Sequence, residues 1–377
     1  MNEGDKLFKG LIITPVIINV INYSIHFLTE IFPPINDPAI WLKYAYALMG
    51  KSYPMWNITS LQYPPFFNLI LAVLILITNN SIESVKILGI ILIILLPLSS
   101  YPLAKRLGGK YAGLASIWIF SFHPSFAEMY GWGGYPNLLG LIFLLITVYF
   151  LVKLLDASSK KYMLYSVISS SLVILTHHLT TIICGILILA YLTIIIYYLI
   201  SRERSISVLH IIPVLSFIAT FIVWRLIARE FQYIIYNPAS LYIRPFNYDA
   251  FWWIFKDPST TILLFVTAVI GLYYLYIKKE YHVVSLLTIW IIFTFLFTQS
   301  YIFGIALDFR RFPIFSVPAV ILSSVSTLGF VNSIRIFKKV DDKNYNIDII
   351  RVFLVSLLIS LIAVSYTHLT LPTTERV

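Results

Sequence analysis

The stretch Ser84-Val-Lys-Ile-Leu-Gly-Ile-Ile-Leu-Ile-Ile-Leu-Leu-Pro-Leu-Ser-Ser-Tyr-Pro-Leu103 is almost entirely apolar, and Ala104-Lys-Arg-Leu-Gly-Gly-Lys110 follows it at once. A run of about 20 mostly apolar residues is long enough to cross the hydrocarbon core of a bilayer as a helix. A short, basic segment directly behind such a run is typical of a loop on the cytoplasmic side. These two neighbouring segments predict a transmembrane helix that ends in an inside loop.

The rest of the chain has the same character. Of its 377 residues, 59% are hydrophobic and 12% are charged, and the mean hydropathy is +0.87. Soluble globular proteins carry about 25% charged residues, and disordered chains are poor in apolar residues, so both classes are excluded. The single cysteine, Cys184, excludes a disulfide scaffold. We therefore predict an all-α protein, a polytopic transmembrane helical bundle in the cell membrane.

Apolar runs of spanning or near-spanning length predict about 11 transmembrane helices. A further apolar run, 65–78, is shorter. The predicted spans are 7–28, 84–103, 111–125, 136–152, 163–177, 179–200, 207–227, 259–277, 282–303, 312–332 and 347–363.

The net charge of +10 is spread over short loops, so we interpret it as a topology signal and expect no nucleic-acid partner. Lys6 and Lys9 predict a cytoplasmic N-terminus. The loop 29–64 is then outside and the basic loop 104–110 inside, which requires an odd number of crossings between them. We therefore expect 65–78 to be a juxtamembrane or re-entrant helix that begins at Pro64-Pro65. The alternative is a true short span with a basic loop outside.

The C-terminal residues 364–377 are treated separately. The run Val364-Ser-Tyr-Thr-His-Leu-Thr-Leu-Pro-Thr373 resembles a translated sequencing adapter. The alternative is a genuine polar tail. We exclude 364–377, including His368, from fold reasoning. We expect 1–363 to form one transmembrane domain whose natural C-terminal part is missing.

Asp37-Pro38 in the first predicted outer loop is the most informative polar site. Asp is a favourable helix cap and Pro fits a first helical turn, so this pair predicts a helix start. The functional alternative is a carboxylate that accepts a proton from an acceptor hydroxyl. Asn19, Asn22 and His26 recur at helical spacing in the first span, which predicts a polar face that leads toward Asp37.

Several stretches, taken in order, resemble the GT-C superfamily of membrane glycosyltransferases, which use polyprenyl-phosphate-linked sugars. The similarity covers about residues 7–332, and the order and placement of the stretches carry it. They are Asp37-Pro-Ala-Ile-Trp-Leu-Lys-Tyr-Ala-Tyr-Ala-Leu-Met-Gly50, Tyr63-Pro-Pro-Phe-Phe67, Ala104–Gly113, His123-Pro124, Gly131-Trp-Gly-Gly-Tyr-Pro-Asn-Leu-Leu-Gly140, Thr176-His-His-Leu-Thr180 and Asp308-Phe-Arg-Arg-Phe-Pro313 with Pro318.

The resemblance implies roles for particular residues. Asp37 matches the family's acidic residue in the first outer loop, its catalytic base or metal-linked carboxylate. In the second outer loop only Glu128 is acidic, and the usual Asp position holds a non-acidic residue, which puts a two-carboxylate mechanism in doubt. Arg310 and Arg311 match an outer arginine that holds the donor phosphate, and arginine suits phosphate recognition. The alternative for this pair is an ion pair with Asp308 or an anchor for lipid headgroups.

Other residues are implied as substrate-binding. His177 and His178 sit at the outer end of two spans, where a neutral histidine can contact a sugar hydroxyl or move a proton; a packing role is the alternative for at least one. Arg244, in the segment 225–258, is a reserve phosphate contact, and Tyr63 belongs to the matched Tyr-Pro-Pro element.

We therefore expect an integral membrane glycosyltransferase that transfers a sugar from a polyprenyl-phosphate donor to a glycan, lipid or protein acceptor at the outer face. Membrane lipids are its other partners. The resemblance is compatible with a divalent metal, Mg²⁺ or Mn²⁺, although no metal ligand set is identified. The alternative class is a non-enzymatic transporter or assembly subunit for lipid-linked glycans, which moves its substrate without bond cleavage. A degenerate family member is a third possibility.

Overall fold

The computed structural model describes residues 3–29, 37–51, 63–228, 258–298 and 316–326, and every regular element within them is helical. This confirms the predicted all-α class. The elements are α1 (Glu3–Thr29), α2 (Asp37–Leu48), α3 (Pro65–Thr78), α4 (Ser81–Phe122), α5 (Pro124–Gly131), α6 (Tyr135–Asp156), α7 (Lys160–Ile174), α8 (His178–Ser201), the 3₁₀ turn η1 (Val208–His210), α9 (Ile212–Ala228), α12 (Pro258–Ile277), α13 (Tyr281–Thr298) and a helix at Ser316–Ser326.

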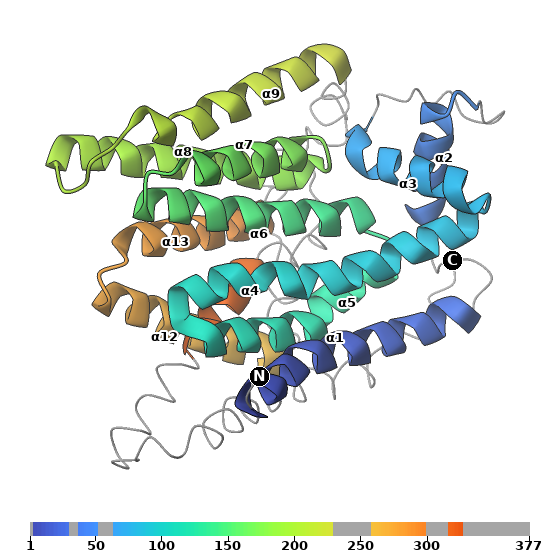
Figure 1. Ribbon diagram of the computed structural model, residues 1–377, viewed down its shortest axis with the longest axis horizontal. Coiled ribbons are helices and arrows are strands. Elements are labelled where there is room, and N and C mark those ends of the chain that lie inside the picture. Colours follow the sequence, from blue (N-terminus) through green and yellow to red (C-terminus); the bar gives the residue numbers. More distant parts are fainter. Residues whose placement is uncertain (1–2, 30–36, 52–62, 229–257, 299–315, 327–377) are drawn as a thin grey trace, which may run out of the picture.

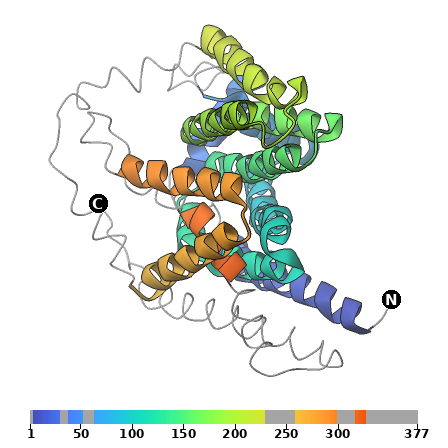
Figure 2. The ribbon, with the colours of Figure 1, turned by 90° about the vertical axis from the view of Figure 1, so that its left-hand side faces the viewer.

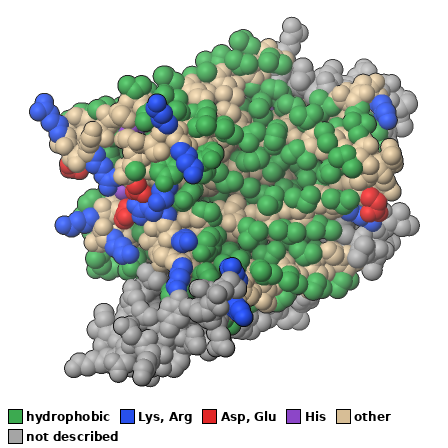
Figure 3. All heavy atoms as spheres, in the orientation of Figure 1, with side chains coloured by type: hydrophobic (Ala, Val, Ile, Leu, Met, Phe, Trp, Pro, Cys, Tyr) green, Lys and Arg blue, Asp and Glu red, His purple; other side chains and the backbone are tan. Residues whose placement is uncertain are grey.

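The long helices lie side by side in one bundle (Figures 1 and 2). Five of the described helices are long and apolar enough to cross a membrane. Their outward faces carry exposed apolar side chains, such as Ile222 and Leu226 on α9. Figure 3 shows these side chains as a broad apolar area, with most of the Lys and Arg side chains at one end of the bundle. Exposed apolar faces of this kind suit contact with lipid. The last predicted span, 347–363, lies outside the described residues.

Helix α4 is two antiparallel helices joined at Gly109. Gly109 has φ +80° and ψ −177°, a conformation that is open to glycine and strained for other residues. The Ser100 hydroxyl donates to the Ser116 hydroxyl at 3.0 Å, which links the two arms across the turn. The predicted spans 84–103 and 111–125 are therefore confirmed as separate helices. The connection is tighter than expected, because helix continues through most of the predicted loop 104–110.

The start of α1 lies beside the Gly109 turn. Phe8 and Tyr111 make an edge-to-face ring contact at 6.5 Å, and Lys110 Nζ lies 5.7 Å from the Phe8 ring. Within α1, Pro15 has no N–H to give to the carbonyl of Leu11. The indole Nε1 of Trp118 donates to this carbonyl instead, at 3.0 Å. This bond satisfies a backbone group that lipid cannot satisfy.

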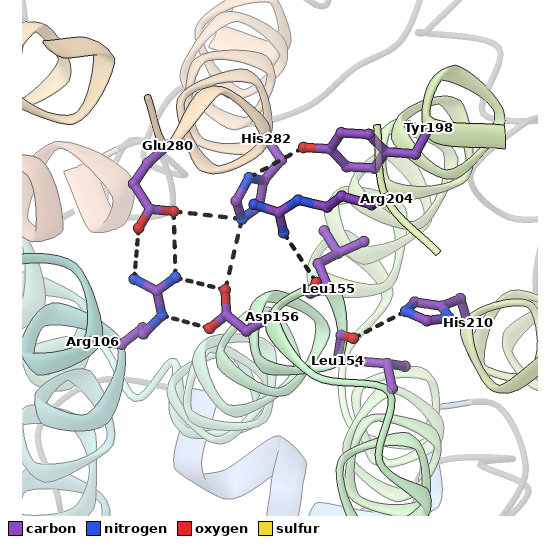
Figure 4. Close-up of polar contacts among 9 residues, drawn as sticks. All are labelled: Arg106, Leu154, Leu155, Asp156, Tyr198, Arg204, His210, Glu280 and His282. Carbon is purple, nitrogen blue, oxygen red and sulfur yellow. Dashed lines mark hydrogen bonds and ion pairs between the residues drawn. The ribbon is translucent and has the colours of Figure 1, made fainter. Parts of the chain in front are cut away.

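A network of ionised side chains joins α4, α6 and α13 at the same end, which we call the basic end (Figure 4). Arg106 contacts both carboxylate oxygens of Asp156 at 2.6 Å, and its Nη1 lies 3.0 Å from Glu280 Oε1. Two carbonyls in the last turn of α6 are also bound: Arg204 donates to Leu155 O and His210 Nε2 donates to Leu154 O, both at 3.0 Å. These contacts fix the ends of helices that are far apart in sequence.

Helix α3 lies at the other end of the bundle, which we call the opposite end. It begins at Pro64-Pro65 as predicted, and the Phe66 N–H donates to Leu175 O at the end of α7 at 2.8 Å. Its 14 residues span about 21 Å, less than the hydrocarbon core of about 30 Å. Asn79 and Asn80 then reverse the chain into α4, which runs to the basic end. Helix α3 thus starts and ends at the same end, as the charge parity predicts.

Candidate active site at the opposite end of the bundle

Asp37 is the first residue of α2, so the predicted helix start is confirmed. The first turn of α2 rests on the turn between α5 and α6. A Cβ added to Gly133 would lie 2.5 Å from Pro38 Cδ and 3.2 Å from Asp37 Cβ. Trp41 Nε1 donates to the carbonyl of Gly133 at 2.7 Å. These contacts join the two sequence segments in which acidic residues were expected.

Glu128 lies on the exposed side of α5, shortly before the Gly133 turn. Helix α5 occupies a segment that was expected to be a loop, and His123 caps it, because His123 Nδ1 accepts the N–H of Ser125 at 3.2 Å. Asp37 packs against Gly133 of the turn that follows α5. The expected departure from a two-carboxylate pattern stays a prediction.

Tyr63 connects α2 with the start of α8. Its ring centroid lies 5.0 Å from Trp41 and 5.6 Å from Tyr44, both on α2. On its other side it lies 5.0 Å from His178 and 6.4 Å from His177. We call these five residues the aromatic cluster. The structure thus brings together Tyr63, His177 and His178, which the sequence predicted as substrate-binding.

His177 is the N-cap of α8, a structural role of the kind expected for at least one of the two histidines. Its Nδ1 accepts the N–H of Thr180 at 3.3 Å and lies 2.9 Å from Thr180 Oγ1. Thr180 Oγ1 in turn donates to Asn137 Oδ1 at 3.1 Å. Helices α6 and α8 approach closely here, because a Cβ on Gly140 would lie 2.9 Å from Thr180 Oγ1.

The polar face expected on α1 is only partly correct. Asn19 is buried and, with Tyr23, Ser121 and Tyr130, lines a cavity of about 20 Å³, large enough for one water molecule. Asn22 is exposed, so the prediction that it shares one face of α1 with Asn19 is wrong. The inward face follows Asn19 and Tyr23, four residues apart, and Asn22 lies outside it. The side chain of His26 is outside the described residues.

The three arginines predicted to contact the donor phosphate, Arg244, Arg310 and Arg311, lie outside the described residues. Sequence reasoning did not assign roles to Trp41, Gly133, Thr180 or Asn137. Two signals were present in the sequence. Gly133-Gly134 stand directly before a helix start, and Thr180 follows His177 by three residues at another helix start.

One group of three metal-ligating side chains occurs among the described residues, namely Asp156, Glu280 and His282. It lies at the basic end, and Arg106 already contacts both of its carboxylates. A guanidinium therefore occupies the place where a cation would bind. At the opposite end, the described residues do not gather three such ligands around Asp37, so they do not by themselves fit a metal site.

Comparison of the sequence with known protein families and curated proteins gives two findings. Residues 62–227 match the family model described as dolichyl-phosphate-mannose-protein mannosyltransferase. No curated protein matches the chain significantly by sequence.

Solved structures match over nearly the whole chain. The oligosaccharyltransferase of Archaeoglobus fulgidus, crystallised with Zn and sulfate, has a TM-score of 0.60 and 13% identity, covering 94% of this chain and 52% of its own. ArnT of Cupriavidus metallidurans bound to undecaprenyl phosphate has a TM-score of 0.55 and 13% identity, covering 96% and 72%. This chain thus spans about half the length of the oligosaccharyltransferase. The similarity to the GT-C membrane glycosyltransferases is confirmed, in fold over most of the chain and in sequence over residues 62–227.

Proposed function

We propose that the protein is a membrane glycosyltransferase that transfers a sugar from a polyprenyl-phosphate donor to the hydroxyl of a glycan, lipid or protein acceptor. The observation that carries this proposal is the joining of Asp37 to the Gly133 turn, beside the aromatic cluster, in a fold shared with ArnT bound to undecaprenyl phosphate. An acidic side chain and a cluster of aromatic rings thus lie at one end of a bundle with exposed apolar faces.

In this mechanism Asp37 accepts the proton of the acceptor hydroxyl. The hydroxyl oxygen then forms a bond with the anomeric carbon of the sugar, and the bond from that carbon to the polyprenyl phosphate oxygen breaks. The ring of Tyr63 offers an apolar face to the sugar. Arg310 or Arg311, with Arg244 in reserve, pairs with the leaving phosphate, since a guanidinium fork matches phosphate oxygens.

The proposed setting is the cell membrane, with the basic end and the N-terminus on the cytoplasmic side. Support comes from the position of α1, whose start lies beside the basic Gly109 turn. A divalent ion such as Mg²⁺ or Mn²⁺ would require ligands besides Asp37 from outside the described residues, so the mechanism contains no step through it.

The test is sugar transfer by the purified protein from a polyprenyl-phosphate donor, compared between wild type, Asp37→Asn and Glu83→Gln. Loss of the base is expected to lower kcat by at least about 100-fold. Glu83 is an exposed acid at the same end, 3.8 Å from Lys86, and its variant should transfer at the wild-type rate. Unchanged turnover in Asp37→Asn removes Asp37 from the mechanism. Movement of the intact lipid-linked sugar without bond cleavage favours a transporter instead.

A further inference from the structure

The cavity of about 20 Å³ between α1, α4 and α5 is lined by an unusual buried serine. Two other buried serines of α4, Ser99 and Ser116, each donate to a carbonyl of their own helix at 2.7 Å. The hydroxyl of Ser121, on the same helix, is buried and has no hydrogen-bond partner among the described residues. Because Ser121 lines the cavity, we expect the partner of this hydroxyl to lie there.

A second polar group at the cavity is a backbone carbonyl in the first arm of α4. In an α-helix the carbonyl of one residue accepts the N–H four residues later, and Pro97 has no N–H to give to the carbonyl of Ile93. Ile93 and Pro97 both line the cavity, so the turn of helix between them borders it. The Ile93 carbonyl therefore needs a donor at the cavity.

Helix α1 shows how this fold satisfies such a carbonyl. Pro15 frees the carbonyl of Leu11, and the indole of Trp118 on α4 donates to it at 3.0 Å. The converse holds at Pro97, where the polar side chain that α1 brings to the cavity is Asn19. Asn19 is 6% exposed, and its carboxamide can both donate and accept. A single water molecule would link this carboxamide to the freed carbonyl.

The cavity lies deep in the bundle. Pro97 stands twelve positions before Gly109 and Ser121 twelve positions after it, so both are at the same level on the antiparallel arms of α4. A rise of 1.5 Å per residue places this level about 18 Å from the Gly109 turn. That depth is near the middle of a hydrocarbon core about 30 Å thick. Lipid offers no hydrogen bond to polar groups at this level, so their partners must come from inside the protein.

We propose that one ordered water molecule occupies this cavity and bonds the Ile93 carbonyl, the Ser121 hydroxyl and the Asn19 carboxamide. The water donates to the carbonyl, and its second proton and its lone pairs suit the other two groups. A buried water makes about three hydrogen bonds and needs a cavity of at least about 10–15 Å³, and this site supplies both.

The water joins α1 to both arms of α4. Of the five candidate spans, α1 is the least buried, with 17% of its apolar window inside the structure against 50% for α4. Hydrogen bonds to α4 are therefore a large part of what holds α1 in place. The Trp118 bond to Leu11 is one attachment, and the water at Asn19 is a second, about 12 Å further along the helix.

The first test detects the water directly. The full chain, labelled with ¹⁵N asparagine and ¹⁵N tryptophan and reconstituted in nanodiscs, is examined by NMR experiments that transfer magnetisation from water to nearby protons. The Asn19 carboxamide should show contact with a long-lived water, and Asn19→Leu assigns this signal by its loss. The Trp118 indole proton, which is bound to a protein carbonyl, should show no such contact. An Asn19 carboxamide without a water contact overturns the proposal.

The second test separates a hydrated cavity from a dry one by the sign of a stability change. Ser121→Val removes the hydroxyl and crowds the water, so the unfolding temperature in nanodiscs should fall by about 2 °C or more. In a dry cavity the added methyl groups would fill empty space and raise it. Ser121→Thr has the same shape as the valine variant and keeps a hydroxyl, so it should stay close to wild type. A rise for Ser121→Val, or equal shifts for the two variants, contradicts the water.

The third test asks whether the freed carbonyl takes part. Pro97→Ala supplies an N–H that can bond the Ile93 carbonyl within the helix, so the water loses one partner. The fall caused by Ser121→Val should then be smaller in the Pro97→Ala background than in the wild type, because the two sites are coupled through the water. The control is Ser166→Ala on α7, whose hydroxyl donates to its own helix at Met163 O and which should shift equally in both backgrounds. Equal falls for Ser121→Val in the two backgrounds overturn the role of the carbonyl. None of the three readouts depends on sugar transfer, so they stand apart from the proposed function.

Discussion

At Gly133 the backbone of the turn between α5 and α6 lies in direct contact with the first turn of α2. Gly133 has φ +82°, and the space that a side chain would need is filled by Pro38. Two contacts position Asp37. One is the packing of Pro38 on Gly133, and the other is the hydrogen bond from Trp41 Nε1 to the Gly133 carbonyl. A single glycine thus allows the proposed base to pack against the turn between α5 and α6.

Gly133→Ala should therefore damage the candidate active site. The new Cβ meets Pro38 at 2.5 Å and the backbone becomes strained, which costs about 1–3 kcal/mol. We expect a fall of about tenfold or more in sugar transfer with a lowered unfolding temperature. Gly131→Ala, two residues earlier with nothing within 4 Å of its Cβ, is the control and should be close to wild type. Equal activity of the two variants would contradict this account.

At the scale of elements, the lengths of the apolar runs and the positions of the prolines predicted most helices. Contacts between side chains distant in sequence could not be predicted in this way. The starts of α2 and α3 follow from Asp37-Pro38 and Pro64-Pro65, whose chemistry is local. Helix α5 was missed because its cap is a histidine, a weaker signal than Ser or Asp. The Trp118 bond to Leu11 was beyond prediction, since it joins residues 107 apart.

This Trp118 bond predicts a difference between two buried tryptophans. Trp118→Phe leaves the Leu11 carbonyl without its donor, which should cost about 1–3 kcal/mol. Trp290 is also buried, and its Nε1 has no hydrogen-bond partner among the described residues. Trp290→Phe should therefore cost less. Thermal unfolding in nanodiscs compares the two variants, and a larger loss for Trp290→Phe would refute the assignment.

Across the whole molecule, the two ends of the bundle differ in kind. The basic end is joined by Arg106, Asp156 and Glu280, and the opposite end by ring contacts and backbone hydrogen bonds. The sequence predicted which loops are basic but not that Asp156 and Glu280 would share one arginine, because those residues are 124 positions apart. The arginines expected at the donor phosphate stay predictions, as they lie outside the described residues.

Arg106→Gln should destabilise the protein more than Lys105→Gln. Removing Arg106 leaves two half-buried carboxylates facing each other without a cation, at a cost of about 1–3 kcal/mol once solvent screening is allowed for. Lys105 is exposed and adjacent in sequence. The measurement is the unfolding temperature of both variants, with sugar transfer as a second readout. A smaller loss for Arg106→Gln would contradict the role of the network.

The concentration of ionised contacts at one end also makes the protein's response to ionic strength uneven. Mobile ions weaken attraction between partly exposed charges and leave aromatic packing largely unaffected. In concentrated salt, amide hydrogen exchange should therefore accelerate first around Asp156 and Glu280, while the amides near Trp41 remain protected. The molecule would loosen at its basic end before the opposite end is disturbed.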